Sequence, residues 1–187
     1  MRIVIFGSGK GSNASNLLNA FSNDPEVNIV SLVSDKPRRG FLDISYEHRV
    51  NLEIIKGPEM SDPKWINHLK LHYRPDYVLL LGFLQKVPVE LIEAFAGRII
   101  NMHPALLPAF GGEGMYGKRV HEAVIAAGVK QSGITFHVID SEYDRGEILK
   151  QYSIQINEGE SAETLETRIH QLEQEKLPEF IHHLEAL

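Results

Sequence analysis

Two side chains suited to acyl transfer lie close together in the segment Asn101-Met102-His103-Pro104. The segment lies at the end of an expected strand at 98–101. Alternate side chains of a strand point the same way, so Asn101 and His103 share one face. An amide can stabilise an oxyanion while an imidazole moves a proton. The pair therefore indicates acyl transfer. The alternative is a strand-end histidine that only bonds a nearby carbonyl.

Three carboxylates lie within the short turn DSEYDRG: Asp140, Glu142 and Asp144. A carboxylate placed beside His103 would fix the tautomer of the imidazole and raise its pKa. A solvated acidic turn is the other interpretation, and the spacing along the chain leaves both open.

A glycine-rich turn near the start of the chain is a candidate anion site. Gly7, Gly9 and Gly11 follow the first apolar run, and Ser12 with Asn13 opens a helical pattern. Backbone N–H groups at the start of a helix bind phosphate when no side chain obstructs them. The alternatives are a merely tight turn and a dinucleotide-binding turn, but Ser12 replaces the last glycine of that pattern. The lysine-serine pair of a P-loop is also missing.

The remaining histidines and the lack of cysteine give no indication of a metal site. His68 and His72 lack the glutamate of a metalloprotease helix, and His182 and His183 lie near the end of the chain, so we expect all four at the surface. The chain contains no cysteine, which excludes a disulfide framework, a thiolate nucleophile and a cysteine zinc site.

Short runs rich in β-branched residues are expected to be the strands that position these side chains. They are nearly continuous in apolar character, as in strands buried on both faces of a parallel sheet. They span residues 2–6, 27–33, 52–55, 77–81 and 98–101. Helical patterns alternate with them at 13–21, from Asp62 and Pro63 to Leu69, and at 88–95.

Beyond residue 130 the pattern predicts a hairpin and a long helix. Residues 133–139 and 147–156 are expected to be antiparallel strands joined by the acidic turn. Ser161 is the expected cap of a final helix, and Pro178 is expected to kink that helix. Its apolar face contains Leu165, Ile169 and Leu172.

Alternating strands and helices predict an α/β fold: a single doubly wound, mostly parallel sheet with helices on both faces and an antiparallel edge hairpin near the C-terminus. We expect residues 1–187 to form one domain, since this length suits a single core. Such sheets bind ligands beyond the carboxyl ends of their strands. Those ends are expected at 7–13, 82–87 and 101–108 and around Asp144.

Composition limits the possible partners. Apolar residues make up 43% and charged residues 24% of the chain, and the formal net charge is −6. A chain with this charge lacks the broad basic field of nucleic-acid-binding proteins, so we expect no nucleic-acid partner. The first apolar run ends at Phe6 and no later run is long enough for a membrane span. We therefore expect no membrane partner and a cytoplasmic location.

Four segments give the chain a resemblance to a known family. They are FGSGKGSN, PDYVLLLGFLQKVP, GRIINMHPALLP and GITFHVIDSEYDRGEIL. In this order and at these spacings, they resemble the phosphoribosylglycinamide formyltransferases from residue 1 to the final helix. The resemblance implies transfer of the formyl group of 10-formyltetrahydrofolate to the amine of glycinamide ribonucleotide, in de novo purine biosynthesis. The products would be formylglycinamide ribonucleotide and tetrahydrofolate. The formyl folate would be a cosubstrate, and no metal is implied.

The resemblance also implies roles for individual residues. The catalytic residues would be Asn101, His103 and Asp144. The ribonucleotide would be bound by Gly11, Ser12, Asn13, Ala14, Ser15 and Glu173. The folate would be bound by Lys64, Leu84, Gln85, Lys86, Val87, Asn101, Asp140, Ser141, Glu142, Tyr143 and Asp144. His137 matches a family histidine near the site and is assigned no role.

One segment departs from the family pattern. After HPALLP the chain continues as AFGGEGMYGKRVHEAV, which is longer and richer in glycine than the short histidine-containing loop of many members. Glycines lower the barrier to rearrangement, so residues 111–117 are expected to form a mobile lid over the folate. A surface insertion is the alternative.

Three other functions are alternatives: two related folate enzymes and a non-catalytic module. Methionyl-tRNA formyltransferase carries a further C-terminal domain for tRNA, whereas this acidic chain ends after its last helix. Formyltetrahydrofolate deformylase uses a similar trio with water as the acceptor, but it follows an N-terminal regulatory domain, and here a strand is expected from residue 2. A non-catalytic receiver or anion-binding module is the third, although a receiver needs acidic residues where this chain has Phe6, Gly7 and Ser8. The resemblance therefore implies a glycinamide ribonucleotide formyltransferase and none of these three.

Overall fold

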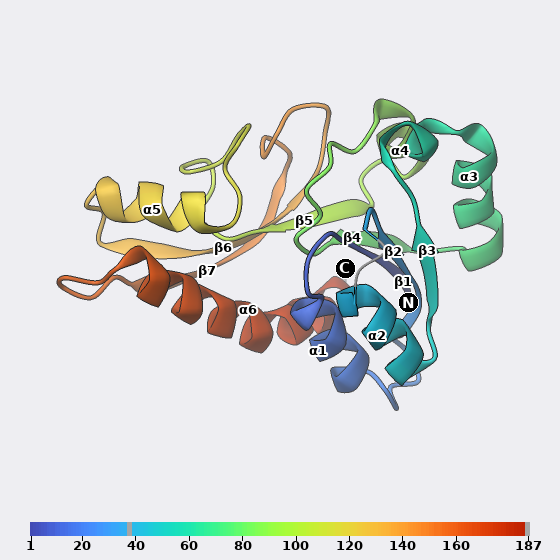
Figure 1. Ribbon diagram of the computed structural model, residues 1–187, viewed down its shortest axis with the longest axis horizontal. Helices are drawn as coiled ribbons and strands as arrows, with labels where there is room; N and C mark the ends of the chain where they lie inside the picture. Colours follow the sequence, from blue (N-terminus) through green and yellow to red (C-terminus); the bar gives the residue numbers. More distant parts are fainter. Residues whose placement is uncertain (37–38, 186–187) are drawn as a thin grey trace. The chain divides into compact units, whose positions relative to one another are not determined.

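The structure, a computed structural model, describes residues 1–36 and 39–185 (Figure 1). Strands and helices alternate through the first hundred residues, and a hairpin and a long helix follow. The elements are β1 (Arg2–Gly7), α1 (Ser12–Ala20), β2 (Asn28–Ser34), α2 (Arg39–His48), β3 (Asn51–Ile54), η1 (Gly57–Ser61), α3 (Pro63–His68), η2 (Leu69–Tyr73), β4 (Tyr77–Leu80), α4 (Val89–Ala94), β5 (Ile99–His103), α5 (Lys118–Ala126), β6 (Gln131–Val138), β7 (Ile148–Gln155) and α6 (Ala162–Glu185).

The strands form one seven-stranded sheet in the order β3-β2-β1-β4-β5-β6-β7. Strand β1 pairs in parallel with β2 and β4, and β2 pairs in parallel with β3. Strands β6 and β7 pair in an antiparallel hairpin at the edge. The predicted fold class is therefore confirmed. The strand order reverses between β1 and β4, which is where doubly wound sheets bind ligands.

The chain forms two compact units, unit 1 (Met1–Ile100) and unit 2 (Asn101–Leu187). In unit 1, the central strand β1 is almost entirely buried. Helix α1 packs with α2, whereas α3 and α4 form a second group with η1. Two helix groups are what a sheet covered on both faces requires. That residues 1–187 act as one domain stays a prediction.

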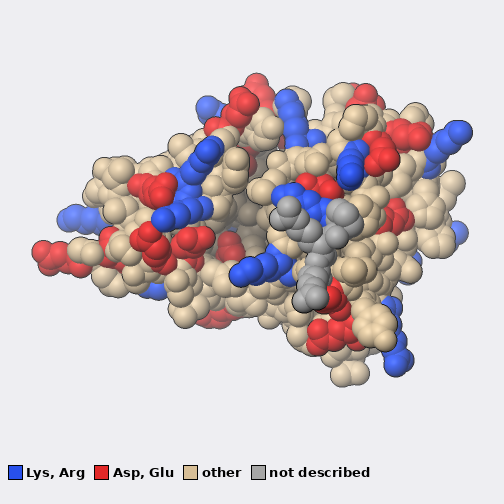
Figure 2. All heavy atoms as spheres, in the orientation of Figure 1, with Lys and Arg blue, Asp and Glu red and all other residues tan. Residues whose placement is uncertain are grey.

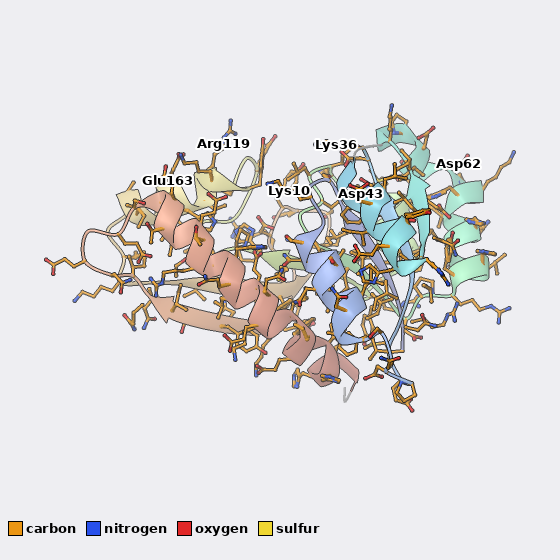
Figure 3. All side chains as sticks on the ribbon, turned by 60° about the horizontal axis from the view of Figure 1, so that its bottom comes forward. Lys10, Lys36, Asp43, Asp62, Arg119 and Glu163 are labelled. Atoms are coloured by element: carbon orange, nitrogen blue, oxygen red, sulfur yellow. The ribbon has the colours of Figure 1, made fainter. Side chains whose placement is uncertain are left out.

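Two helices begin at the capping residues that the sequence predicts. Asp62, labelled in Figure 3, accepts a hydrogen bond from the Lys64 backbone N–H (2.8 Å), as expected of the residue that begins α3. Ser161 accepts one from the Thr164 N–H (3.2 Å) at the start of α6. Helix α6 continues through Pro178 to Glu185, so the proline does not end it.

Two α-helices were not expected from the sequence, α2 and α5. In α2, Phe41 and Ile44 are buried, but Leu42 and Tyr46 are exposed at 54% and 89%. These exposed apolar side chains obscure the helical period of the buried ones. The helix beginning at Lys118 follows the glycine-rich segment, and the sequence offers no capping side chain there, since its N-cap is Gly117.

In unit 2, helix α6 packs on the β6–β7 hairpin (Figure 1). Phe136 stacks on Phe180 of α6, with ring centroids 3.9 Å apart. Because side chains alternate along a strand, Thr135 and His137 point to the opposite face of β6 from Phe136. Both are completely buried. The packing of α6 therefore fixes the strand that carries these two polar residues.

Charges of both signs are interspersed on the face of the molecule drawn in Figure 2. Over residues 1–36 and 39–185, no helix has the length and apolar character needed to cross a membrane.

Candidate active site

Strand β5 carries Asn101 and His103 to its carboxyl end. Asn101 is half-buried, whereas His103 is 3% exposed. The Asn101 amide Nδ2 lies 3.0 Å from Nε2 of His137. The His103 Nδ1 lies 3.6 Å from Oδ2 of Asp144. The structure thus brings together the three residues that the sequence comparison assigned to catalysis, all within unit 2.

The acidic turn between β6 and β7 contributes one carboxylate to this cluster. Asp144 is half-buried and has a left-handed backbone, with φ of 55°. Its Oδ2 accepts a hydrogen bond from the Gly112 N–H (2.9 Å). The four preceding residues of the turn are exposed: Asp140, Ser141, Glu142 and Tyr143. Asp144 is therefore held beside His103 and is less solvated than the rest of the acidic turn.

His137 is the member of the cluster that the sequence left without a role. Its Nδ1 lies 3.0 Å from the Val138 carbonyl, which can only accept, so Nδ1 carries a proton and Nε2 is the nitrogen that is bare in the neutral form of the ring. That Nε2 accepts from the Asn101 amide and lies 3.5 Å from Asp144 Oδ1. The sequence signal that could have indicated a role for His137 is strand alternation, which places it on the same buried face as Thr135.

Burial controls the charge of His103. It lowers the pKa of the imidazole below its ordinary value, and the Asp144 charge and the Phe110 carbonyl oppose this without overcoming it. The expectation that the carboxylate would give a raised pKa is therefore wrong. Asp144 acts in the expected direction, but the desolvation of a side chain that is 3% exposed has the larger effect.

Asp144 stays ionised beside this neutral imidazole. Burial alone would raise the pKa of Asp144, but the adjacent His137 side chain, the Gly112 N–H and the charge that His103 carries when protonated together lower it below its ordinary value. At neutral pH the cluster therefore contains a carboxylate and an imidazole that is ready to accept a proton.

The glycine-rich turn of unit 1 connects β1 to α1. Gly11 has a φ of 80° and is the N-cap of α1. A Cβ at this position would lie 2.5 Å from Cδ1 of Ile44, so the packing of α2 alone requires glycine here. Lys10, labelled in Figure 3, is exposed in this turn and was not singled out from the sequence. Phosphate binding by residues 11–15 stays a prediction.

The predicted folate segment lies beside this turn. Ser8 N–H donates to the Gly82 carbonyl (3.1 Å), and Ser8 Oγ accepts from the Leu84 N–H (3.0 Å). Leu84 is 50% exposed, which leaves apolar surface for a ring, whereas Val87 is buried. Lys86 is exposed.

Gln85 has a structural task within the same segment. Its Oε1 accepts from the Gly57 N–H (2.9 Å), and its Nε2 donates to Oδ2 of Asp35 (3.1 Å). Both ends of the amide are thus engaged inside unit 1. A contact between Gln85 and folate stays a prediction.

The two remaining predicted residues lie on helices. Lys64 is exposed in the first turn of α3 in unit 1. Glu173 lies on α6 in unit 2, half-buried, with Oε2 3.1 Å from Nδ1 of His170. This hydrogen bond raises the pKa of His170.

The chain is similar to known formyltransferases over most of its length. A family model described as formyl transferase matches residues 1–181. A phosphoribosylglycinamide formyltransferase of Bacillus subtilis is 32% identical over 192 residues, covering all of this chain and 95% of that protein. A chloroplastic one of Arabidopsis thaliana is 38% identical over 175 residues, 90% of this chain. The chain spans only 60% of the length of that plant protein.

A solved structure shows the likeness in three dimensions. The phosphoribosylglycinamide formyltransferase from Anaplasma phagocytophilum has a TM-score of 0.89 at 29% identity. The match covers all of this chain and 87% of that one.

Proposed function

This chain belongs to the formyl transferase family, and we propose that it transfers the formyl group of 10-formyltetrahydrofolate to the amine of glycinamide ribonucleotide. The observation that supports this most directly is the cluster of Asn101, His103 and Asp144 in unit 2. An amide, a neutral imidazole and a carboxylate are the groups that acyl transfer to an amine needs. The names of the bacterial and plant relatives support the choice of substrates.

In the proposed reaction, the cluster stabilises the oxyanion and transfers the proton. Asn101 donates a hydrogen bond to the oxygen that becomes an oxyanion when the amine nitrogen bonds to the formyl carbon. His103 accepts the proton that the attacking amine loses, and Asp144 stabilises the imidazolium that results. His103 then returns this proton to the folate nitrogen as the old carbon–nitrogen bond breaks. One proton is accepted and one is returned, so the charges balance.

An assay with purified protein tests the proposed function. The substrates are 10-formyltetrahydrofolate and glycinamide ribonucleotide, and the products are the formylated ribonucleotide and tetrahydrofolate. One control omits the ribonucleotide, and the other replaces the formyl folate with formate. Release of formate at the same rate without the ribonucleotide would identify a hydrolase instead of a transferase.

In the proposed complex, residues 11–15 bind the ribonucleotide phosphate, and Lys10 adds a positive charge. We expect a dephosphorylated substrate to bind roughly 100-fold or more weakly, because each hydrogen bond to a charged group contributes about 1.5–3 kcal/mol. Lys10→Ala should weaken binding of the natural substrate only about two- to fivefold, as for an exposed ion pair worth up to about 1 kcal/mol.

Isothermal titration calorimetry of both substrates with both proteins checks this prediction. Lys10→Ala is preferred to a change at Gly11, because a larger residue there would collide with Ile44 and disturb the fold. Lys70→Ala, a change at an exposed lysine of η2, is the control. Equal affinities for the phosphorylated and dephosphorylated substrates would move the phosphate site elsewhere.

Asp144→Asn keeps the shape of the carboxylate but removes its charge. Since the Asp144 charge raises the pKa of His103 against the effect of burial, its loss should lower that pKa further. The acid limb of the kcat/KM profile should then move to lower pH, because the neutral imidazole is the proton acceptor. The imidazolium formed during the reaction loses its partner, so kcat should fall roughly 10- to 100-fold, equivalent to about one to two pKa units.

A double-mutant cycle measures the coupling behind this prediction. Asp144→Asn should cost much less in a His103→Ala background than in the wild type, because the two residues act as one unit. Asp140→Asn is the matched control, since Asp140 is an exposed carboxylate of the same turn. Equal costs of Asp144→Asn in both backgrounds, with an unmoved acid limb, would separate Asp144 from the proton transfer.

The proposal extends to the remaining predicted contacts. Leu84 to Val87, Lys64 and the turn at 140–144 bind the folate, and Glu173 binds the ribonucleotide. Residues 1–187 act as one formyltransferase domain, which the match of one family model to residues 1–181 supports. A single cooperative unfolding transition followed by two spectroscopic probes tests that point.

We also propose a cytoplasmic location. The acidic composition and the lack of a membrane-crossing helix in the described ranges are compatible with it. The Arabidopsis relative is named chloroplastic, so location varies among relatives. Fractionation of the native cells with an antibody to the protein tests this part of the proposal.

A further inference from the structure

We propose that the turn formed by Phe110, Gly111 and Gly112 (the 110–112 turn) is a positioning element for His103 and Asp144. Its carbonyl at Phe110 keeps a proton on Nε2 of His103, and its N–H at Gly112 holds Asp144 beside the other ring nitrogen. What the pair catalyses rests on the proposed function; how the turn holds the pair does not.

The contact at His103 determines the tautomer of the ring. Nε2 of His103 lies 2.8 Å from the Phe110 carbonyl oxygen, in an interior where the side chain is 3% exposed. A carbonyl only accepts hydrogen bonds, so Nε2 must carry the proton. The neutral imidazole then has a bare Nδ1, and this is the atom 3.6 Å from Asp144 Oδ2. The proton that His103 gains and loses is therefore the one on Nδ1.

The contact at Asp144 acts on the same oxygen. Gly112 N–H donates to Oδ2 of Asp144 (2.9 Å), which is the oxygen that faces Nδ1 of His103. Gly111 packs closely between the two contacts. A Cβ on Gly111 would lie 2.5 Å from Cδ2 of Leu107 and 3.0 Å from Cβ of Asp144. A side chain at this position would push the turn away from the pair.

The base of the turn is fixed to the hairpin. Thr135 Oγ1 donates to the Ala105 carbonyl (2.7 Å) and accepts from the Leu107 N–H (3.0 Å). Gln151 Nε2 donates to the Leu107 carbonyl (2.8 Å). These bonds fasten the chain three residues before Phe110, whose φ of 56° is rare for a residue with a side chain. The turn therefore starts from a fixed base, and a mobile lid at 111–117 stays a prediction.

Other ionisable groups face the pair and must be followed in any test. His137 Nε2 lies 3.5 Å from Asp144 Oδ1, whereas His103 faces the other oxygen, Oδ2. His121 on α5 interacts electrostatically with His103, and its own pKa is lowered, chiefly by burial. A test that resolves each histidine separately is needed to isolate the effect of the turn.

Nitrogen-15 NMR of the ligand-free, histidine-labelled full chain resolves the tautomers. The wild type should show His103 with its proton on Nε2 above its pKa. Gly111→Ala and Gly112→Ala should mix the two tautomers, move the acid limb of kcat/KM and lower kcat roughly 10- to 100-fold, as for a misplaced catalytic group. Gly128→Ala is the matched control. Gly112 and Gly128 both have positive φ and no atom within 4 Å of an added Cβ, but Gly128 follows α5.

Two results would overturn the inference. One is a wild-type His103 with its proton on Nδ1. The other is a loss of activity in the Gly111 and Gly112 variants with the same tautomer and pH profile as Gly128→Ala. If Gly111→Ala fails to fold, Leu107→Val/Gly111→Ala removes the closest collision and repeats the test. A wild type with the expected tautomer but without transferase activity would refute the proposed function alone.

Discussion

Replacing His103 by alanine is expected to lower kcat by roughly 10²- to 10⁴-fold, the usual contribution of a positioned acid or base. The imidazole is buried, its Nε2 is held by the Phe110 carbonyl, and its Nδ1 faces Asp144. Burial lowers the pKa of His103, so the wild-type ring is neutral at neutral pH and can accept the amine proton. Alanine offers no such acceptor. The Michaelis constants should change much less than kcat, because the proton moves only during the reaction.

Steady-state kinetics with both substrates, from pH 5 to 9, measure this loss. His68→Ala is the control, because it removes a half-exposed imidazole that pairs with Glu53 in unit 1. Added imidazole should restore part of the activity of His103→Ala but leave His68→Ala unchanged. A His103→Ala protein with wild-type kcat and an intact fold would remove His103 from the reaction.

The fold could be predicted from the sequence because its main signals are local. The apolar runs that became β1, β2 and β4 are buried on both faces, so they carry no alternation that surface residues could obscure. Helix α3 begins at its predicted cap, Asp62. Helix α2 was missed because its apolar residues do not all face the core: Tyr46 is 89% exposed.

The site could be predicted only in part, because packing decides which carboxylate of the turn lies beside His103. Strand alternation placed Asn101 and His103 on one face, but spacing could not choose among three carboxylates of the turn. The choice of Asp144 depends on its hydrogen bond from Gly112, 32 residues earlier in the chain. The sign of the pKa shift at His103 was also wrong, because the sequence shows that a carboxylate is near but not how deeply the ring is buried.

The role of His137 depends on contacts that its place in the sequence does not reveal. A histidine within an apolar strand is compatible with a packed core as well as with a site. Only the structure shows that its two ring nitrogens have different partners, the Val138 carbonyl and the Asn101 amide.

Asn101→Ala should lower kcat by roughly 10²- to 10³-fold, as the loss of one oxyanion donor does elsewhere. The amide group has two N–H donors, and one of them is held by Nε2 of His137 at 3.0 Å. Because the Nδ1–H of His137 is bound to the Val138 carbonyl, Nε2 is free of a proton and can accept. This bond sets the orientation of the second N–H, which we expect to point at the developing oxyanion.

His137 substitutions separate orientation from chemistry. His137→Ala leaves the Asn101 amide present but unheld, so kcat should fall by roughly tenfold, less than in Asn101→Ala, since misplacement of a group costs part of its effect. His137→Gln keeps an acceptor and should retain more activity. In an Asn101→Ala background, His137→Ala should cost little more, because the group that it orients is already missing. An undiminished cost in that background would mean that His137 acts on Asp144, 3.5 Å away, and not on Asn101.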